Sequence, residues 1–194
     1  MNQPSNKKDF WKINWCKKYN VIYADPPWKY SNTDVSKHYP CISIKEIYKF
    51  PIHYFSDKNC ALFLWTPLRI LPEAIETLRR WGFRYVTVAF NWIKTNKTNG
   101  RPFLGMGGWT RANSELCLLG LKGRLKRNSG NVSQVVLSQR REHSRKPDEV
   151  RERIVGLLGN LPRIELFARQ TMPGWDCWGD ETTKFNKREV ENGK

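Results

Sequence analysis

Residues 21–28 read VIYADPPW, an apolar run that ends in an acid, two prolines and an aromatic residue. The run from Val21 to Ala24 predicts a buried strand. Asp25 and Trp28 then follow at the carboxyl end of that strand. Because open α/β sheets bind their ligands beyond the carboxyl ends of the strands, the sequence predicts a functional site at Asp25.

The rest of the chain alternates between strand-like and helix-like segments. We expect strands over 21–24, 60–65, 85–93, 115–121, 132–137, 163–167 and 175–178, and helices over 44–50, 72–81 and 147–158. The last two helices have a proline near the first turn and a glycine past the end. This alternation predicts one α/β domain over 1–194, with a mostly parallel sheet and helices on both faces. Residues 1–18 form a basic arm and 183–194 a charged tail.

The composition favours a polyanionic partner. The chain carries 34 Lys and Arg against 18 Asp and Glu, a formal net charge of +16. Ribosomal and structural basic proteins share such a surplus, but nine Trp argue against a disordered basic tail. The scattered cysteines and histidines form no ligand pattern, so we expect no metal and a reduced, cytoplasmic setting. No apolar run is long enough for a bilayer, which predicts no membrane partner.

The segment Asp25–Trp28, called the tetrad below, suits an exocyclic amine on a nucleobase. The Asp25 carboxylate and the Pro26 carbonyl can each accept one amine hydrogen, which favours the pyramidal nitrogen that methylation requires. Pro27 keeps Pro26 extended and so fixes that carbonyl. Trp28 offers a face on which an extruded base can stack. The alternative is a strand followed by a proline turn, with Trp28 buried in the core.

Further blocks follow the tetrad in order: LFLWTP at 62–67, NWIKTN at 91–96, GGWTRANSELCLLGLKG at 107–123, RKPDE at 145–149, IELFAR at 164–169 and GWDCWGDE at 174–181. From about residue 20 to 181 the chain resembles the adenine-N6 methyltransferases related to the catalytic subunit of the eukaryotic messenger-RNA adenosine methyltransferase. That family includes compact bacterial and phage DNA methyltransferases. The resemblance implies a Rossmann-like fold with a permuted motif order, in which the tetrad precedes the main strand that binds S-adenosylmethionine.

The same resemblance implies a cofactor site. It assigns S-adenosylmethionine contacts to Asp25, Lys146, Phe167, Arg169, Gln170, Thr171, Asp180 and Glu181. Lys146 can neutralise the cofactor carboxylate, or it can be a solvated lysine before a helix. Glu181 can accept from ribose hydroxyls. The chain departs from the eukaryotic enzyme at Thr171 and Met172, where that enzyme has histidine and asparagine, and Asp180 replaces the asparagine that is commoner in the family.

The resemblance also implies a surface for nucleic acid. The residues that it places near the substrate are Tyr39, Trp109, Arg111, Asn113, Glu115, Arg140, Arg141 and Arg145. Tyr39 can instead anchor its loop, and Glu115 can be the internal partner of an arginine. We expect further basic residues to join this rim around the pocket, at Lys122, Arg124, Lys126 and Arg127. The alternative for these cations is a solvated basic surface.

Together these features predict an S-adenosylmethionine-dependent enzyme that methylates adenine N6 in nucleic acid. DNA is favoured, because the chain is short and resembles the compact members. RNA remains an alternative, as do methylation of the cytosine amine and a non-catalytic nucleic-acid-binding subunit that supports a partner. The complete tetrad favours the enzyme. The family includes heterodimers, and whether this chain associates with a second copy of itself in a homodimer is open.

Overall fold

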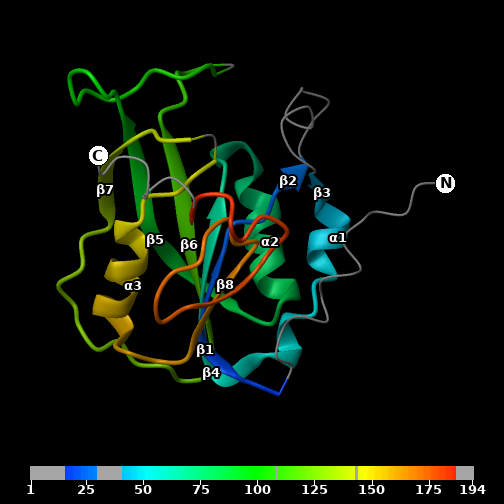
Figure 1. Cartoon of the computed structure of the whole chain (residues 1–194). Coiled ribbons are helices and arrows are strands. Elements are labelled where there is room, and N and C mark those ends of the chain that lie inside the picture. The colour runs from blue at the N-terminus through cyan, green and yellow to red at the C-terminus, as the bar shows by residue number, and fades with distance from the viewer. Residues whose placement is uncertain (1–15, 30–40, 108, 143, 187–194) are drawn as a thin grey trace.

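The apolar run forms β1 (Tyr19–Ala24), which lies inside a seven-stranded sheet (Figure 1). The computed structural model describes residues 16–29, 41–107, 109–142 and 144–186. The other strands of this sheet are β4 (Ser56–Thr66), β5 (Arg84–Thr95), β6 (Ser114–Lys122), β7 (Val135–Gln139), β8 (Arg163–Leu166) and β9 (Asp176–Trp178). Their order across the sheet is β7-β5-β6-β4-β1-β8-β9.

One strand of this sheet runs against the others. β1 pairs in parallel with β4 and β8, β8 with β9, and β5 with β7, whereas β6 is antiparallel to both β4 and β5. The predicted mostly parallel sheet is therefore confirmed. The reversal also has a consequence for the site: β6 begins at the edge where its neighbours end, and it ends at the opposite edge.

The strands are buried on both faces because each face supports its own core. On β1, Ile22 and Ala24 belong to one apolar cluster, and Val21 and Tyr23 belong to the other. β4 alternates in the same way between Leu62 and its neighbour Phe63. A strand that is covered on both sides carries a continuous apolar run, which is why the sequence pattern was easy to interpret.

Helices cover both faces, as predicted. α1 (Ile44–Tyr48) and α2 (Leu71–Arg80) lie on one side of the sheet and α3 (Glu149–Leu158) on the other (Figure 1). A capping box between Ser43 and Glu46 begins α1. Two 3-10 turns, η4 (Ile52–Tyr54) and η5 (Leu68–Ile70), flank β4, and the short strands β2 (Trp28–Lys29) and β3 (Ile42–Ser43) form a separate pair. Every predicted element is present, with bounds that differ by a few residues.

The long loop between β5 and β6 projects past the end of the sheet (Figure 1). It folds back on itself through a bridge between Thr95 and Pro102 and a hydrogen bond from the Gly105 amide to the Ala112 carbonyl. No helix within the described residues combines the length and apolar character that crossing a bilayer requires. The single-domain organisation of residues 1–194 stays a prediction, and most of the predicted arm and tail lies outside the described residues.

Candidate active site

A cavity of about 480 Å³ opens at the edge where the parallel strands end. The tetrad forms one wall, directly after β1. Lys94 near the end of β5, Glu115 near the start of β6 and Phe167 after β8 contribute from neighbouring strands. The structure therefore has a cavity at the carboxyl end of β1, where the sequence predicted the site. The cavity volume falls within the range of roughly 300–1,000 Å³ that small-molecule sites occupy.

Four charged side chains of alternating sign form a chain of ion pairs in this cavity. The Lys146 Nζ lies 2.7 Å from Oδ2 of Asp25 and 3.2 Å from Oε2 of Glu115. The Glu115 Oε1 in turn accepts from the Lys94 Nζ at 2.5 Å. Oδ1 of Asp25 accepts no hydrogen bond within the described residues. One oxygen of Asp25 is therefore fixed by Lys146, and the other is available to a ligand.

The four charges shift one another's protonation. Burial raises the pKa of Asp25 above its ordinary value, and the nearby Lys146 ammonium opposes this shift without cancelling it. Burial would also raise the pKa of Glu115, but Lys146 and Lys94 together bring it below its ordinary value. For Lys146, burial acts to lower the pKa, and the two carboxylates raise it well above the usual lysine range. Lys146 therefore stays charged, while Asp25 is a more basic carboxylate than Glu115.

The chain reversal at β6 explains why Glu115 is in the site. Glu115 is paired with Trp92 in the β5–β6 ladder, two residues from Lys94. The expected arginine partner of Glu115 is wrong: both partners are lysines. Lys94 was not singled out from the sequence, although a lysine inside the otherwise strand-like NWIKTN block was a detectable signal.

The tetrad is built as a rigid corner. The Pro26 carbonyl accepts from the Trp28 amide at 2.9 Å, and the Pro27 carbonyl accepts from the Ile42 amide at 2.8 Å. The Pro26 carbonyl keeps a second lone pair for a ligand. Trp28 is only 3% exposed, and its Nε1 donates to the Trp65 carbonyl at 2.9 Å. Trp28 thus borders the cavity as part of the core, which leaves little of its face for the predicted base stacking.

Two residues beside the cavity have strained backbones. Phe167 has a φ of 59° and Ser144 a φ of 64°, and they are the non-glycine residues with positive φ in the described part of the chain. This region is unfavourable for a bulky side chain, and such residues cluster at ligand sites. Phe167 is held there by Phe50 and Trp178, at ring distances of 5.2 and 5.4 Å. The strain turns the chain after β8 toward the cavity.

The far side of the cavity is formed by Arg169, Asp180 and Glu181, as the resemblance implied. Nε of Arg169 donates to Oε2 of Glu181 at 2.8 Å, and Lys184 approaches the other oxygen. Burial raises the pKa of Glu181, but Lys184 and Arg169 outweigh this effect and lower it. These residues bring a cation and two acids to the cavity.

Gln170 and Thr171, in contrast, do not line the cavity. Gln170 is buried and donates to Oδ1 of Asp148 at 2.8 Å, and Thr171 bonds with Asn186 on the surface. Their predicted cofactor contacts are therefore not supported by this geometry. The chain leaves the cavity only after Arg169: Ala168 and Arg169 still line it, whereas the side chain of Gln170 turns to Asp148.

Asp148 braces the basic segment that carries Lys146. It accepts from Arg141 at 2.5 Å and from Arg151 at 3.0 Å, and Arg141 also donates to the Lys146 carbonyl at 2.8 Å. Arg151 is buried and makes two 2.7 Å hydrogen bonds to Glu165 on β8. The brace therefore ties the Lys146 segment to α3 and, through it, to the sheet.

The predicted substrate residues separate into two groups. Arg140 and Arg141 line the cavity together with Glu115. The others that are described do not line it: Arg145 pairs with Glu142 and Asp148, and Trp109, Arg111 and Asn113 belong to the projecting loop. Trp109 is fully exposed there. Tyr39 lies outside the described residues.

The expected basic rim is wrong for one set of cations. Lys122 ends β6, and Arg124, Lys126 and Arg127 follow it. Because β6 is antiparallel to its neighbours, these residues lie at the edge of the sheet opposite the cavity. Several cavity residues, in turn, were missed individually: Ile42, Thr66, Pro67, Trp92, Lys94, Glu142, Ser144, Ala168, Trp178 and Gly179. No group of three or more His, Cys, Asp or Glu within the described residues is arranged to hold a metal ion.

Comparison with known proteins agrees with this geometry. The MT-A70 family profile matches residues 19–181, most of the chain. The type II methyltransferase M.MunI of a Mycoplasma species is 34% identical over 198 residues, which cover 90% of this chain and 82% of the relative. The human N(6)-adenosine-methyltransferase catalytic subunit METTL3 is 32% identical over 168 residues, 84% of this chain but 28% of the relative. A putative N(6)-adenosine-methyltransferase MT-A70-like protein of Medicago truncatula is 32% identical over 84% of this chain and 26% of its own length. The chain therefore belongs to the MT-A70 family of methyltransferases.

Proposed function

We propose that this protein transfers a methyl group from S-adenosylmethionine to the N6 amine of adenine in DNA. The observation that carries the proposal is the Asp25 carboxylate at the end of β1. Lys146 holds its Oδ2 at 2.7 Å, its Oδ1 accepts no hydrogen bond within the described residues, and the residue lines a cavity of about 480 Å³. A fixed acceptor with one available oxygen suits an amine that must be held during methylation.

The chain's own residues account for the treatment of the amine. Oδ1 of Asp25 and the second lone pair of the Pro26 carbonyl can each accept one amine hydrogen. Because burial raises the pKa of Asp25, this carboxylate is better suited than an ordinary aspartate to take up the proton that the methylated nitrogen loses. The rigid tetrad also positions the amine for methyl transfer, and the buried Trp28 forms a fixed wall of the cavity.

The cavity also fits the proposed cofactor. Its donor and acceptor set matches the polar groups of S-adenosylmethionine: Arg169 and Lys146 for a carboxylate, Asp25 for an ammonium, and Asp180 or Glu181 for ribose hydroxyls. Phe167 and Trp178 add aromatic surface, although no particular residue is assigned to the adenine ring. When bound, the cofactor supplies an electrophilic methyl group on a sulfonium.

DNA is proposed over RNA because of the relatives' lengths. The match to the type II methyltransferase, a class that modifies DNA, spans most of both chains. The matches to adenosine methyltransferases cover about a quarter of those longer proteins. RNA adenosine methylation is the second candidate, since METTL3 is named an N(6)-adenosine-methyltransferase and adenosine is the ribonucleoside of adenine. The projecting loop with Trp109 and Arg111, together with Arg140 and Arg145, is proposed to contact the nucleic acid.

The proposal is tested by methyl transfer to defined oligonucleotides. The protein is incubated with labelled S-adenosylmethionine and matched single- and double-stranded DNA and RNA, and the modified base is identified by mass spectrometry. We expect N6-methyladenine in DNA, and loss of product in Asp25→Asn. Asp176→Asn, at the other end of the sheet, is the matched control that should keep activity. Absence of product on every substrate, with no cofactor binding by calorimetry, would instead favour a non-catalytic subunit.

Three further expectations stay predictions. A cytoplasmic location rests on the scattered cysteines, and the described ones form no disulfide. Dimerisation, with a second copy or another chain, is tested by sedimentation. Discrimination against the cytosine amine is tested by including adenine-free DNA in the transfer assay.

A further inference from the structure

Unpaired positive charge gathers at the end of the sheet opposite the cavity. Most cations that line the cavity have acidic partners: Lys94 and Lys146 pair with Glu115, Arg141 with Asp148 and Arg169 with Glu181, whereas Arg140 lies over the Phe103 ring. At the opposite end, Lys18, Lys58, Arg84, Arg124, Lys126 and Arg127 are exposed, and none of the six forms an ion pair within the described part of the chain. These six residues are called the basal surface.

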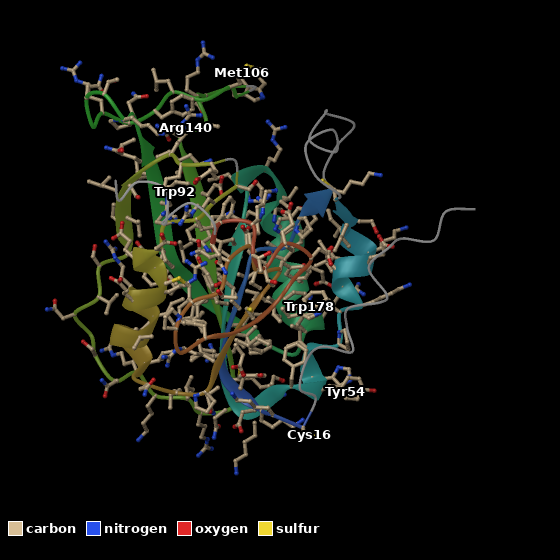
Figure 2. The ribbon with its side chains drawn as sticks, in the orientation of Figure 1. Cys16, Tyr54, Trp92, Met106, Arg140 and Trp178 are labelled. Atoms are coloured by element: carbon tan, nitrogen blue, oxygen red, sulfur yellow. The ribbon has the colours of Figure 1, made fainter. Side chains whose placement is uncertain are left out.

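The basal surface is continuous because its residues come from four adjacent strands. Arg84 begins β5, the basic turn follows β6, Lys58 is near the start of β4, and Lys18 immediately precedes β1. The ladders confirm the alignment, since Arg84 pairs with Leu121 and Cys60 pairs with Lys122. Four neighbouring strands span about 14 Å. Figure 2 shows Cys16 and Tyr54 at this end of the molecule and Met106 and Arg140 at the other.

The turn after β6 presents its cations from a fixed backbone. The Arg124 amide donates to the Asn59 side chain at 2.8 Å, and the Asn128 amide donates to the Leu157 carbonyl at 2.7 Å. Between these anchors, Leu125 packs against the core beneath α3. The side chains of Lys126 and Arg127 therefore project to solvent from a backbone that is ordered in advance, which lowers the entropy lost on binding.

We propose that the basal surface binds the phosphate backbone of a nucleic-acid segment that lies away from the methylated base. This rests on the proposed function, because it takes nucleic acid as the substrate. A duplex carries one negative charge per about 1.7 Å, so a 14 Å row faces on the order of eight phosphate charges. The nine residues of β6 separate this surface from the cavity by about 27 Å. The two sites thus engage different parts of a long or bent substrate.

The binding arm of the test uses a 40-base-pair duplex of G·C pairs without cofactor. Fluorescence anisotropy across a salt series compares the wild type with Lys126→Gln/Arg127→Gln. We expect the variant to bind on the order of tenfold more weakly at 0.1 M salt. Its salt slope should fall by up to about 1.8, because each phosphate contact contributes about 0.9. The charge-preserving variant Lys126→Arg/Arg127→Lys should bind like the wild type.

The matched control is Lys45→Gln/Lys49→Gln, which removes the same charge from exposed positions on α1 and at its C-cap. Equal weakening in both double variants would overturn the proposal, since a general charge effect would then suffice. Unchanged affinity and salt slope in Lys126→Gln/Arg127→Gln would overturn it too. A third result would also overturn the proposal: if Lys126→Gln/Arg127→Gln no longer binds anionic phospholipid vesicles but binds the duplex like the wild type, the partner of the basal surface is a membrane surface.

The kinetic arm separates this proposal from the proposed function. In Lys126→Gln/Arg127→Gln the KM for a 40-base-pair adenine-containing duplex should rise, with kcat unchanged and with no effect on a ten-nucleotide substrate. If no substrate is methylated but the binding arm behaves as expected, the proposed function fails and the basal surface stands. If methylation occurs and the KM of the long duplex is unchanged, the basal surface fails and the proposed function stands.

Discussion

Replacing Lys146 with methionine tests the charged chain of the cavity most directly. Methionine keeps the length and apolar stem of lysine but removes the ammonium that joins Asp25 to Glu115. The side chains of Lys146 and Asp25 are 9% and 21% exposed, so the pair is largely shielded from water. Breaking such a pair costs about 3–5 kcal/mol, and we expect about 3 kcal/mol because Asp25 keeps some contact with solvent.

The pH dependence gives this prediction a distinct signature. In the wild type, the pKa of Glu115 is lowered by folding. Its ionised carboxylate therefore stabilises the fold at a pH above the ordinary glutamate pKa, and this stabilisation is lost as the pH falls through the lowered pKa. The pKa of Asp25 is raised by folding, so ionisation of Asp25 lowers the folding stability as the pH rises. Without Lys146, burial raises the pKa of Asp25 further and offsets more of the lowering at Glu115. Protonation of these carboxyl groups at lower pH then removes buried negative charge and stabilises the variant. The stability difference between variant and wild type should therefore shrink from pH 8 to pH 5.

The assay is urea unfolding followed by tryptophan fluorescence at pH 8, 7 and 5. Lys184→Met is the matched control: it removes a surface partner of Glu181, with Lys184 39% exposed, and should cost less than about 1 kcal/mol. Adding Asp25→Asn to Lys146→Met should recover about 1 kcal/mol, since Asp25 loses its ion-pair partner in the single variant whereas Glu115 keeps Lys94. A stability difference that is constant across pH, or a cost equal to that of the control, would refute the electrostatic reasoning.

Three other substitutions test the Asp148 brace, the turn after β6 and the buried ion pair between Arg151 and Glu165. Asp148→Asn removes the charge that braces the Lys146 segment, and should lower stability by about 2 kcal/mol in urea unfolding and reduce kcat more than it raises KM. Gly123→Ala places a side chain at a φ of 68°, where its Cβ would collide with the β4 backbone. Thermal unfolding should show a loss of about 2–3 kcal/mol of stability. Gly82→Ala is the control: Gly82 also has a positive φ but open space around it, so the loss should be about 1 kcal/mol. Glu165→Gln leaves the buried Arg151 with Asp148 as its remaining charged partner, and should cost about 3 kcal/mol by the same measurement.

Much of the fold follows from local patterns. The runs at β1 and β4 are apolar throughout because both faces of these strands are covered, and helix ends are marked by local chemistry such as the capping box at Ser43. Local pattern fixes an element's type but not its direction in the sheet. The reversal of β6 therefore could not be predicted from its sequence, which is why the cations after Lys122 were assigned to the wrong end.

The candidate site divides in the same way. Asp25 was predictable, because an acid directly after a buried strand must lie at the edge of the sheet. Gln170 was predicted to face the cofactor, but its side chain is buried and donates to Asp148, although its neighbour Arg169 lines the cavity. Which of two neighbouring side chains enters the cavity depends on tertiary packing, about which composition and spacing carry no information.

The sequence by itself determined the elements, the two-sided core, the positive charge and the position of Asp25, since these depend on neighbours along the chain. Tertiary structure alone decided that Lys94 and Glu115 meet Lys146 in the cavity, because pairing between an antiparallel strand and its neighbours joins residues that are distant in sequence. It also decided that the unpaired cations lie at the opposite end of the sheet. Both outcomes have one physical cause: the direction of β6 is set by packing and hydrogen bonding across the whole sheet.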